Sequence, residues 1–386
     1  MWRAKWALWR WLLLASAACP SMTAQQPPAP QAAPAQAQGI ETARQGMQLL
    51  MDGDFDKAIL VFRQVEQADP ESPLGYVLEA DANWWKIYLT EGNLIDPDVF
   101  EALSEAATPY DAEFQRLSNL AIQKAEAQIH RHQDEARAHL YEGFAYALKA
   151  RLEGLRDHAL GTARAGKKMR NLSLTALKLD PTLYDAYLGV GIYNYFEATL
   201  PTYVKMLRFL ILLPGGDREL GLQQLQTAAD KGEITKGEAQ FHLAKNLSRN
   251  NERQYEKSLE TFRTLVREYP ENPLWKLLVG GLEIRMGQTQ EGEALYRDVI
   301  QTTQNPQSDL WKSLHQQAQK ALDRRSGHGG AATLPFLFSL SPSPFDFGPA
   351  FQSTKHTTKA RRVGNACMVM RMSAGRPAIA ELIIRA

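Results

Sequence analysis

The chain has 386 residues, with 44 Lys and Arg against 43 Asp and Glu, and a formal net charge of +1. This length suffices for two average domains or for one elongated repeat array. Because the charges are balanced and scattered, the composition predicts no surface that follows a nucleic-acid backbone. The only two cysteines, Cys19 and Cys367, exclude an internal disulfide framework, so packing must hold the fold.

Residues 1–24 have the pattern of an export signal. Basic residues precede an apolar run at positions 11–18, and small residues follow it. The run is far shorter than the ~20 residues of a membrane-spanning helix, so we expect no stable anchor from it alone. We favour cleavage after Ala24, with cleavage after Ala17 as an alternative. Lipid attachment to Cys19 is a third option, since Ser-Ala-Ala before it resembles a bacterial lipoprotein box. These features predict a periplasmic or extracellular protein, membrane-anchored if Cys19 carries lipid.

Residues 25–39 and 40–325 differ in composition. The first segment is rich in Pro, Ala and Gln and has no charge, which predicts an extended linker with no apolar face to bury. The second is dense in helix formers, with apolar residues at spacings of three and four and breaks about one helix apart. No stretch in it alternates like a β-strand. The sequence therefore predicts an all-α domain over residues 40–325.

A pattern of small, aromatic and proline positions recurs within this domain, at the spacing of a helix-turn-helix unit of about 34 residues. It comprises Gly46, Ala58, Phe62, Val65 and Pro70, then Ser258, Phe262, Leu265 and Pro270, and then Gly280, Gly292, Tyr296 and Val299. The small residue lets two helices approach closely, the aromatic side chain fills the adjoining gap, and the proline ends the second helix. The recurrence predicts stacked helix pairs.

The units in the middle of the domain are longer. Gly143 belongs to a first helix and Asp180 ends a second, but the segment between them exceeds one standard unit. Tyr187 and Leu243 open further units. We predict about six or seven units with lengthened helices in the middle. A closing helix over residues 308–323 has one polar side, which suits a cap on the open end of the stack.

This pattern resembles the tetratricopeptide repeat family across residues 40–325. Residues 200–210 and 213–219 further resemble exported bacterial tetratricopeptide repeat proteins of unassigned role. The resemblance implies a right-handed superhelical α-solenoid whose concave face, lined by the first helix of each unit, binds peptides or helices of partner proteins. It implies no reaction.

The family's concave positions fall mainly on aromatic and aliphatic residues of this chain. The predicted groove comprises Trp84, Trp85, Arg137, Leu140, Phe144, Leu188, Ile192, Tyr195 and Phe196, with Val77, Asp81 and Leu148 beside them. Family members that clamp a free C-terminal carboxylate use concave Lys, Asn and Arg, so we expect an amphipathic helix or an extended apolar segment as the ligand here. The alternative is that the aromatic residues other than Phe144 fill gaps between the lengthened helices.

No combination of residues predicts catalysis, a cofactor or a metal site. His130 and His132 are two positions apart and point in different directions on a helix, and Cys367 lies outside the repeats. Two glycines before Asp217 could cradle a phosphate, but the Lys of a phosphate-binding loop is missing, so we predict a turn capped by Asp217. A pocket with converging polar groups at residues 200–217 would favour an enzyme instead.

Two segments leave alternatives open. Residues 206–213 are apolar nearly all round, which favours a buried helix, with a hairpin at a membrane surface as the alternative. The tail, residues 326–386, has no repeat period. We expect it to be a low-order segment, a small partner-dependent element or the product of a shifted reading frame.

The combined prediction is a protein-binding scaffold of the cell envelope or exterior that takes a partner helix or peptide in its concave groove. A membrane-tethered structural component, held by lipid at Cys19 or by residues 206–213, is the alternative. Neither prediction includes an enzyme activity or a nucleic-acid partner, and the oligomeric state is left open.

Overall fold

The computed structural model of the chain describes residues 34–90, 94–98, 106–200, 212–304 and 309–326. Within these residues it contains thirteen helices and no strand, so the predicted all-α class is confirmed. Each described helix packs against the next one described, as in a tetratricopeptide-type solenoid.

The described helices form six pairs and one closing helix. The first helices of the pairs are α1 (Pro34–Met51), α3 (Leu74–Thr90), α5 (Glu135–Leu155), α7 (Ala186–Thr199), α10 (Lys236–Leu247) and α12 (Pro273–Arg285). The second helices are α2 (Phe55–Ala68), α4 (Asp111–His130), α6 (Ala159–Leu179), α9 (Arg218–Lys231), α11 (Tyr255–Glu268) and α13 (Thr289–Thr302). The closing helix is α14 (Asp309–Ser326).

Small residues face aromatic rings inside the pairs, as the repeat pattern predicts. A Cβ atom added to Gly46 on α1 would overlap the ring of Phe62 on α2. On α12, a Cβ at Gly280 would lie 3.1 Å from the ring of Tyr296 on α13. Both rings are almost completely buried. The glycines therefore set the close approach of the two helices in the first and sixth pairs.

The predicted lengthening of the middle helices is confirmed for the second and third pairs only. Helices α5 and α6 have 21 residues each and α4 has 20, whereas α7 and α9 have 14 and α10 has 12. The extra turns extend the inner and outer surfaces of the second and third pairs.

The ends of the helical body differ from the predicted boundaries. Helix α1 begins at Pro34, inside the predicted linker, because Ala and Gln favour helix and proline is tolerated in the first turn. Helix α14 runs to Ser326. The predicted signal at residues 1–24, the tail after 326 and most of the apolar run 206–213 lie outside the described residues.

The stack curls so far that its first pair meets its fifth and sixth pairs. The carbonyl oxygen of Met51, at the end of α1, accepts hydrogen bonds from the Asn272 side-chain amide (2.9 Å) and the Trp275 indole N–H (3.0 Å). The Gln48 side-chain amide donates to the carbonyl of Glu268 (3.1 Å). The two bonds to Met51 satisfy its carbonyl oxygen, which has no partner within α1 because it lies at the helix end. Helix α14 also contacts α3 across the interior.

An aromatic cluster fills the interior where α3 crosses α10 and α12. The Trp85 ring lies 5.2 Å from the ring of Phe241 and 6.0 Å from that of Trp275, measured between centroids. Tyr88 lies 6.1 Å from Phe241 on the same side. Edge-to-face contacts at these distances add to the apolar area that the rings bury. The cluster joins the N-terminal and C-terminal halves of the stack into one core.

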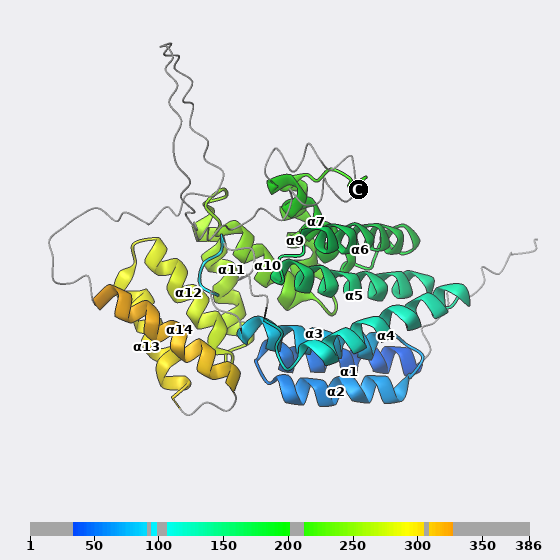
Figure 1. Cartoon of the computed structure of the whole chain (residues 1–386), viewed down its shortest axis with the longest axis horizontal. Coiled ribbons are helices and arrows are strands. Elements are labelled where there is room, and N and C mark those ends of the chain that lie inside the picture. Colours follow the sequence, from blue (N-terminus) through cyan, green and yellow to red (C-terminus); the bar gives the residue numbers. More distant parts are fainter. Residues whose placement is uncertain (1–33, 91–93, 99–105, 201–211, 305–308, 327–386) are drawn as a thin grey trace, which may run out of the picture.

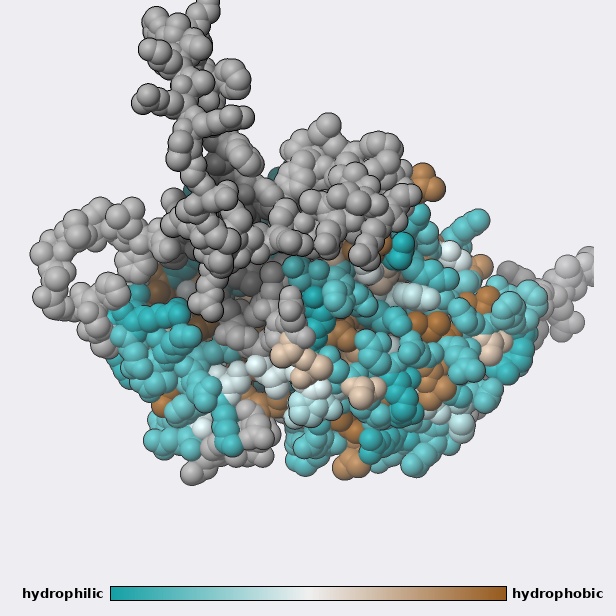
Figure 2. All heavy atoms as spheres, in the orientation of Figure 1, coloured by the Kyte–Doolittle hydropathy of each residue, from teal (hydrophilic) through white to brown (hydrophobic). Residues whose placement is uncertain are grey.

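Hydrophilic residues cover most of the described surface on the face shown in Figure 2, and apolar residues lie between them in small groups. Figure 1 shows α1 to α6 on one side of the molecule and α12 to α14 on the other, with α10 and α11 between them. Among the described helices, none is both long enough and apolar enough to cross a bilayer.

Candidate functional site

The predicted groove residues lie on first helices, as expected, but most of them are buried. Trp84 and Trp85 on α3 are each 3% exposed. Leu140, Phe144, Leu188 and Tyr195 are also buried, and Arg137, Ile192 and Phe196 are partly exposed. The inner surface available to a partner is therefore smaller than the residue pattern alone suggests.

The two tryptophans face neighbouring helices. Trp85 belongs to the aromatic cluster with Phe241 and Trp275. Trp84 packs against Phe114 on α4, with a centroid distance of 6.5 Å, and the Arg151 guanidinium lies 6.0 Å from its ring centre. These contacts match the alternative that the aromatic side chains fill the space between helices.

Tyr195 and Phe196 lie elsewhere, against the end of α10. The Tyr195 hydroxyl donates to the carbonyl of Asn246 at 3.4 Å, and the Arg249 guanidinium lies 5.6 Å from the Phe196 ring centre. The structure therefore does not gather all the predicted residues into one groove.

A hollow on the inner face brings part of the prediction together. It is shallow, with a cavity volume of about 20 Å³, which is room for about one water molecule. We call it the inner hollow; its lining is Met47, Val77, Leu78, Asp81, Phe144, Ala147, Leu148, Arg151, Leu188, Thr235 and Glu238. These residues come from α1, α3, α5, α7 and the start of α10. Phe144 and Leu188 of the predicted groove therefore share one cavity with Val77, Asp81 and Leu148.

Three buried charged groups form one side of the inner hollow. The Arg151 Nη1 atom lies 2.9 Å from Glu238 Oε1 and 3.7 Å from Asp81 Oδ1. All three side chains are less than a tenth exposed. Two carboxylates on one guanidinium give the hollow a polar side among mostly apolar walls.

Burial controls the protonation of this group. Burial raises the pKa of Asp81 well above its usual value, the negative charge of Glu238 raises it further, and the Arg151 charge opposes both. On the next turn of α10, burial lowers the pKa of His242 well below its usual value, and the charges of Arg151 and Lys245 lower it further. The neutral forms of Asp81 and His242 are favoured, which reduces the net charge inside the stack.

Asp185, just before α7, binds the turn that leads into α10. Its Oδ1 atom accepts hydrogen bonds from the N–H groups of Ile234 (3.0 Å) and Thr235 (2.8 Å) and from the Thr235 hydroxyl (2.8 Å). These bonds satisfy N–H groups of the turn that have no helical partner and join the starts of α7 and α10.

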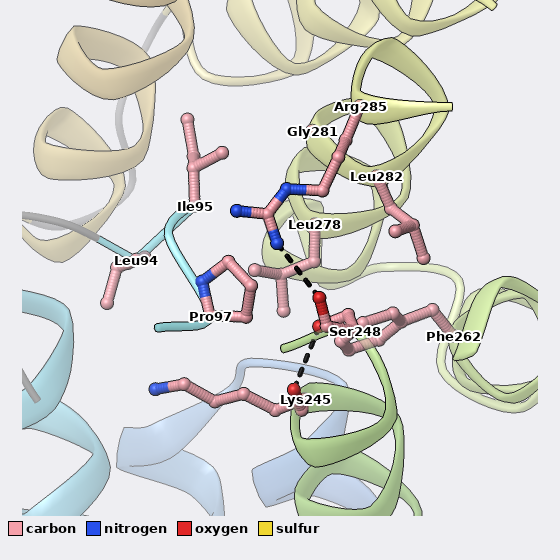
Figure 3. Close-up of a pocket in the computed structure, with 10 residues that line it drawn as sticks. All are labelled: Leu94, Ile95, Pro97, Lys245, Ser248, Phe262, Leu278, Gly281, Leu282 and Arg285. Carbon is pink, nitrogen blue, oxygen red and sulfur yellow. Dashed lines mark hydrogen bonds between the residues drawn. The ribbon is translucent and has the colours of Figure 1, made fainter. Parts of the chain in front are cut away.

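A second hollow lies farther along α10 and is partly filled by the chain itself. Residues 94–98, which follow α3 and are called the strap below, lie against α10 and α12. Figure 3 shows Pro97 next to Leu278, and Ile95 lies against Gly281. We call this the strap hollow; its lining is Leu94, Ile95, Pro97, Lys245, Ser248, Phe262, Leu278, Gly281, Leu282 and Arg285.

Arg285 anchors the strap. Its Nη1 atom donates to the carbonyl oxygen of Ser248 at 2.8 Å, and its Nη2 atom lies 3.2 Å from Asp98 Oδ2. The N–H of Asn250 donates to the other carboxylate oxygen of Asp98 at 2.8 Å. At the other end, the N–H of Leu94 donates to the side chain of Gln317 on α14 at 3.0 Å. The strap thus contacts three elements of the C-terminal half.

The turn before α9 has the structural role predicted for it. The Asp217 carboxylate accepts a hydrogen bond from the N–H of Leu220 at 2.9 Å and so caps α9. The Tyr193 hydroxyl donates to the carbonyl of Pro214 at 2.7 Å, which holds the turn against α7. The N-terminus of α9, which follows the two glycines, is therefore already capped by the Asp217 side chain.

Sequence reasoning missed Arg151, Glu238 and the strap. Arg151 and Glu238 look like ordinary charges on amphipathic helices, and the strap has no periodic pattern. Among the residues that the structure describes, no three or more His, Cys, Asp and Glu side chains are grouped closely enough to hold a metal ion.

Comparison with known proteins supports the repeat assignment. Residues 238–272 match the sequence model of the family described as Tetratricopeptide repeat. The matched segment includes Glu238 of the inner hollow, all of α11 and Asn272, the cap of α12. A comparison with curated proteins gave no match.

Proposed function

We propose that the chain is an interaction scaffold of the cell envelope or exterior, because residues 238–272 match the tetratricopeptide repeat, a fold that generally mediates protein–protein interaction. It binds a partner helix or an extended peptide on the inner face of the stack. The export-signal pattern of residues 1–24 supports the proposed location.

The inner hollow is the observation that carries the proposal. Its walls include Val77, Phe144, Leu148 and Leu188, and it opens toward solvent. An apolar partner side chain packed over its mouth would lose contact with water where it meets these walls, and such contacts favour binding. Arg151, held by Glu238 and Asp81, joins α3, α5 and α10 on the polar side of the hollow.

The accessible members of the predicted groove are the proposed contact residues. Arg137 on α5 and Ile192 and Phe196 on α7 are partly exposed, and Phe196 lies against the end of α10, apart from the inner hollow. Arg137 forms an ion pair with Glu233, with 3.7 Å between Nη1 and Oε2. Glu233 lies two residues before Thr235, which lines the inner hollow. Trp84 and Trp85 support the partner surface from behind.

Site-specific photo-cross-linking tests this proposal. A photoreactive residue replaces Ala147, which lines the hollow and is partly exposed, and a control replaces Leu60, which is 59% exposed on α2. In cells that make the protein, we expect a discrete adduct from position 147 and none from position 60. Adding Phe144→Ala should remove the adduct. An adduct that persists with Phe144→Ala, or equal labelling from both positions, would overturn the proposal.

The alternative is a membrane-tethered structural component. Leu212, at the described end of the apolar run 206–213, is 75% exposed, which favours an apolar contact outside the stack. Fractionation of cells carrying Cys19→Ser, Leu212→Ser or both substitutions tests this reading. Release into the soluble fraction by Cys19→Ser indicates a lipid anchor, and release by Leu212→Ser indicates the apolar run. A wild-type protein that is already soluble excludes both forms of tethering.

A further inference from the structure

The strap lies against the C-terminal repeats as a short bound peptide would. Its Ile95 side chain enters a notch made by Gly281 on α12: a Cβ atom at Gly281 would be 2.6 Å from Ile95 Cγ2 and 3.8 Å from Ile95 Cβ. Those distances leave no room for a larger residue at position 281 while Ile95 is in place. The notch therefore recognises an aliphatic side chain by shape.

Three residues later, the strap presents a carboxylate to a preorganised basic group. Asp98 Oδ2 lies 3.2 Å from Arg285 Nη2, and the N–H of Asn250 binds the other oxygen at 2.8 Å. The Ser248 carbonyl holds the guanidinium in position at 2.8 Å. Asp96 adds a second carboxylate 3.9 Å from the same guanidinium. The strap hollow thus recognises an acidic side chain by charge.

These two features belong to the inner face and do not depend on how the strap is joined to the chain. Gly281 and Arg285 lie one turn apart on α12, and Ser248 and Asn250 follow α10. First helices line the same inner face from which we propose that a partner is bound. The strap itself belongs to no helix pair, because it lies between α3 and α4.

We propose that the strap hollow is a second peptide-binding site, occupied from within by residues 94–98, and that its external ligand carries an aliphatic residue three positions before an aspartate or glutamate. This inference rests on the proposed scaffold function and adds a ligand chemistry to it. An incoming segment replaces Ile95 over Gly281 and Asp98 at Arg285, so the ligand makes the same two interactions that the strap releases.

The resident segment sets the threshold for binding. A tethered competitor acts at an effective concentration on the order of millimolar, so an external peptide binds wild-type protein only weakly. The apparent affinity is reduced by the fraction of molecules whose hollow is open. Weakening the strap raises that fraction, and locking the strap lowers it.

A disulfide between positions 95 and 281 provides the lock. The Cβ separation of 3.8 Å expected for these positions matches disulfide geometry. The full chain carries Ile95→Cys and Gly281→Cys in a background of Cys19→Ser and Cys367→Ser, which removes the two natural cysteines. The probe is a fluorescein-labelled copy of residues 93–98, Asn-Leu-Ile-Asp-Pro-Asp, read by fluorescence anisotropy.

For the cysteine pair the probe carries Ala in place of its isoleucine, because a side chain at position 281 leaves no room for Ile. We expect this probe to bind the reduced protein and to bind the oxidised protein at least about tenfold more weakly, because the lock removes the open fraction. A strap-weakened variant, Ile95→Ser with Asp98→Asn, should bind the probe more tightly than wild type does. Adding Arg285→Ala to that variant, or Asn in place of the last aspartate of the probe, should abolish the gain. Circular dichroism checks that each variant is folded.

Equal binding in the oxidised and reduced states would overturn the inference, as would a folded strap-weakened variant that does not bind the probe. The probe-binding result can be distinguished from the cross-linking result that tests the proposed function. An adduct at position 147 without probe binding leaves the scaffold and removes the second site, whereas probe binding without an adduct retains the second site and removes the partner at the inner hollow.

Discussion

The inner hollow and the strap hollow both place an arginine on the inner face, but they surround it differently. Arg151 meets two carboxylates, and all three groups are almost completely buried. Arg285 meets Asp98, whose side chain is 29% exposed. The first arrangement is part of the core, since its partners have no access to bulk water. The second can exchange its carboxylate for another, since water reaches both partners. Burial thus separates a structural charge from an exchangeable one.

The aromatic cluster lies between the two hollows and joins the two halves of the stack. Removing its Trp85 ring should therefore cause the largest loss of stability. Along α10, Phe241 lies between Glu238 of the inner hollow and Lys245 of the strap hollow, and Trp85 packs on it. Trp85→Ala should lower the free energy of unfolding by about 4 kcal/mol, because it leaves a cavity where α3 meets α12. Urea denaturation measures this loss. Trp85→Phe should lose much less, and equal losses would show that the ring does not join the halves.

Removing each arginine in turn tests the contrast directly. Arg151→Met leaves Glu238 buried without its guanidinium and should lower the free energy of unfolding by about 3 kcal/mol. The matched change Arg285→Met should lower it by about 1 kcal/mol, because Asp98 can turn to solvent. Urea unfolding of both variants at the same pH gives the comparison. If the two losses are equal, burial does not distinguish the two sites.

Because Asp81 is protonated in the fold, the free energy of unfolding should depend on pH. Because burial raises its pKa above the unfolded value of 3.8, its contribution to stability is fully present below that pH and is lost as pH rises through the folded pKa. Asp81→Asn imitates the neutral carboxyl at every pH. At pH 8 the free energy of unfolding of the variant, measured by urea denaturation, should therefore exceed that of wild type by about 1 kcal/mol. At pH 4 the gain should be smaller. A destabilised variant at pH 8 would mean that the ionised form is favoured.

The smallest expected effect belongs to the strap. Asp98→Asn weakens a partly exposed ion pair with Arg285 and should lower the free energy of unfolding by about 0.5 kcal/mol. The same change should speed hydrogen exchange at the N–H of Asn250, which donates to Asp98, while leaving core helices protected. Hydrogen-exchange mass spectrometry measures the difference. Unchanged exchange at Asn250 would show that the strap is held without its carboxylate.

Much of the fold could be predicted because the repeat is a local pattern. Gly46 and Phe62 are 16 positions apart, as are Gly280 and Tyr296, and each pair meets inside one helix-turn-helix unit. Helix lengthening in the middle and the cap at Asp217 also follow from short segments. Short-range spacing records these contacts directly, so a single sequence suffices to find them.

The candidate site was harder to predict because its contacts join distant segments. The positions of Trp84 and Trp85 on a first helix were predicted, but their burial depends on α4, α5, α10 and α12, which close over them. Asp81 and Glu238 approach the same arginine only when the stack curls. No periodicity within one unit encodes that curvature. Whether a partner touches the predicted groove residues stays a prediction.

The double hydrogen bond at Met51 limits how such a protein can change during evolution. Trp275 lies 224 residues after Met51 and meets it only because the intervening pairs turn the chain through the right total angle. In an open array each repeat touches only its neighbours, so gene duplication can add or delete one without disturbing the others. Here an added or deleted pair would carry α12 past the end of α1 and break the junction. Descendants of this chain are therefore expected to keep the number of pairs between the two residues and to vary in their loops.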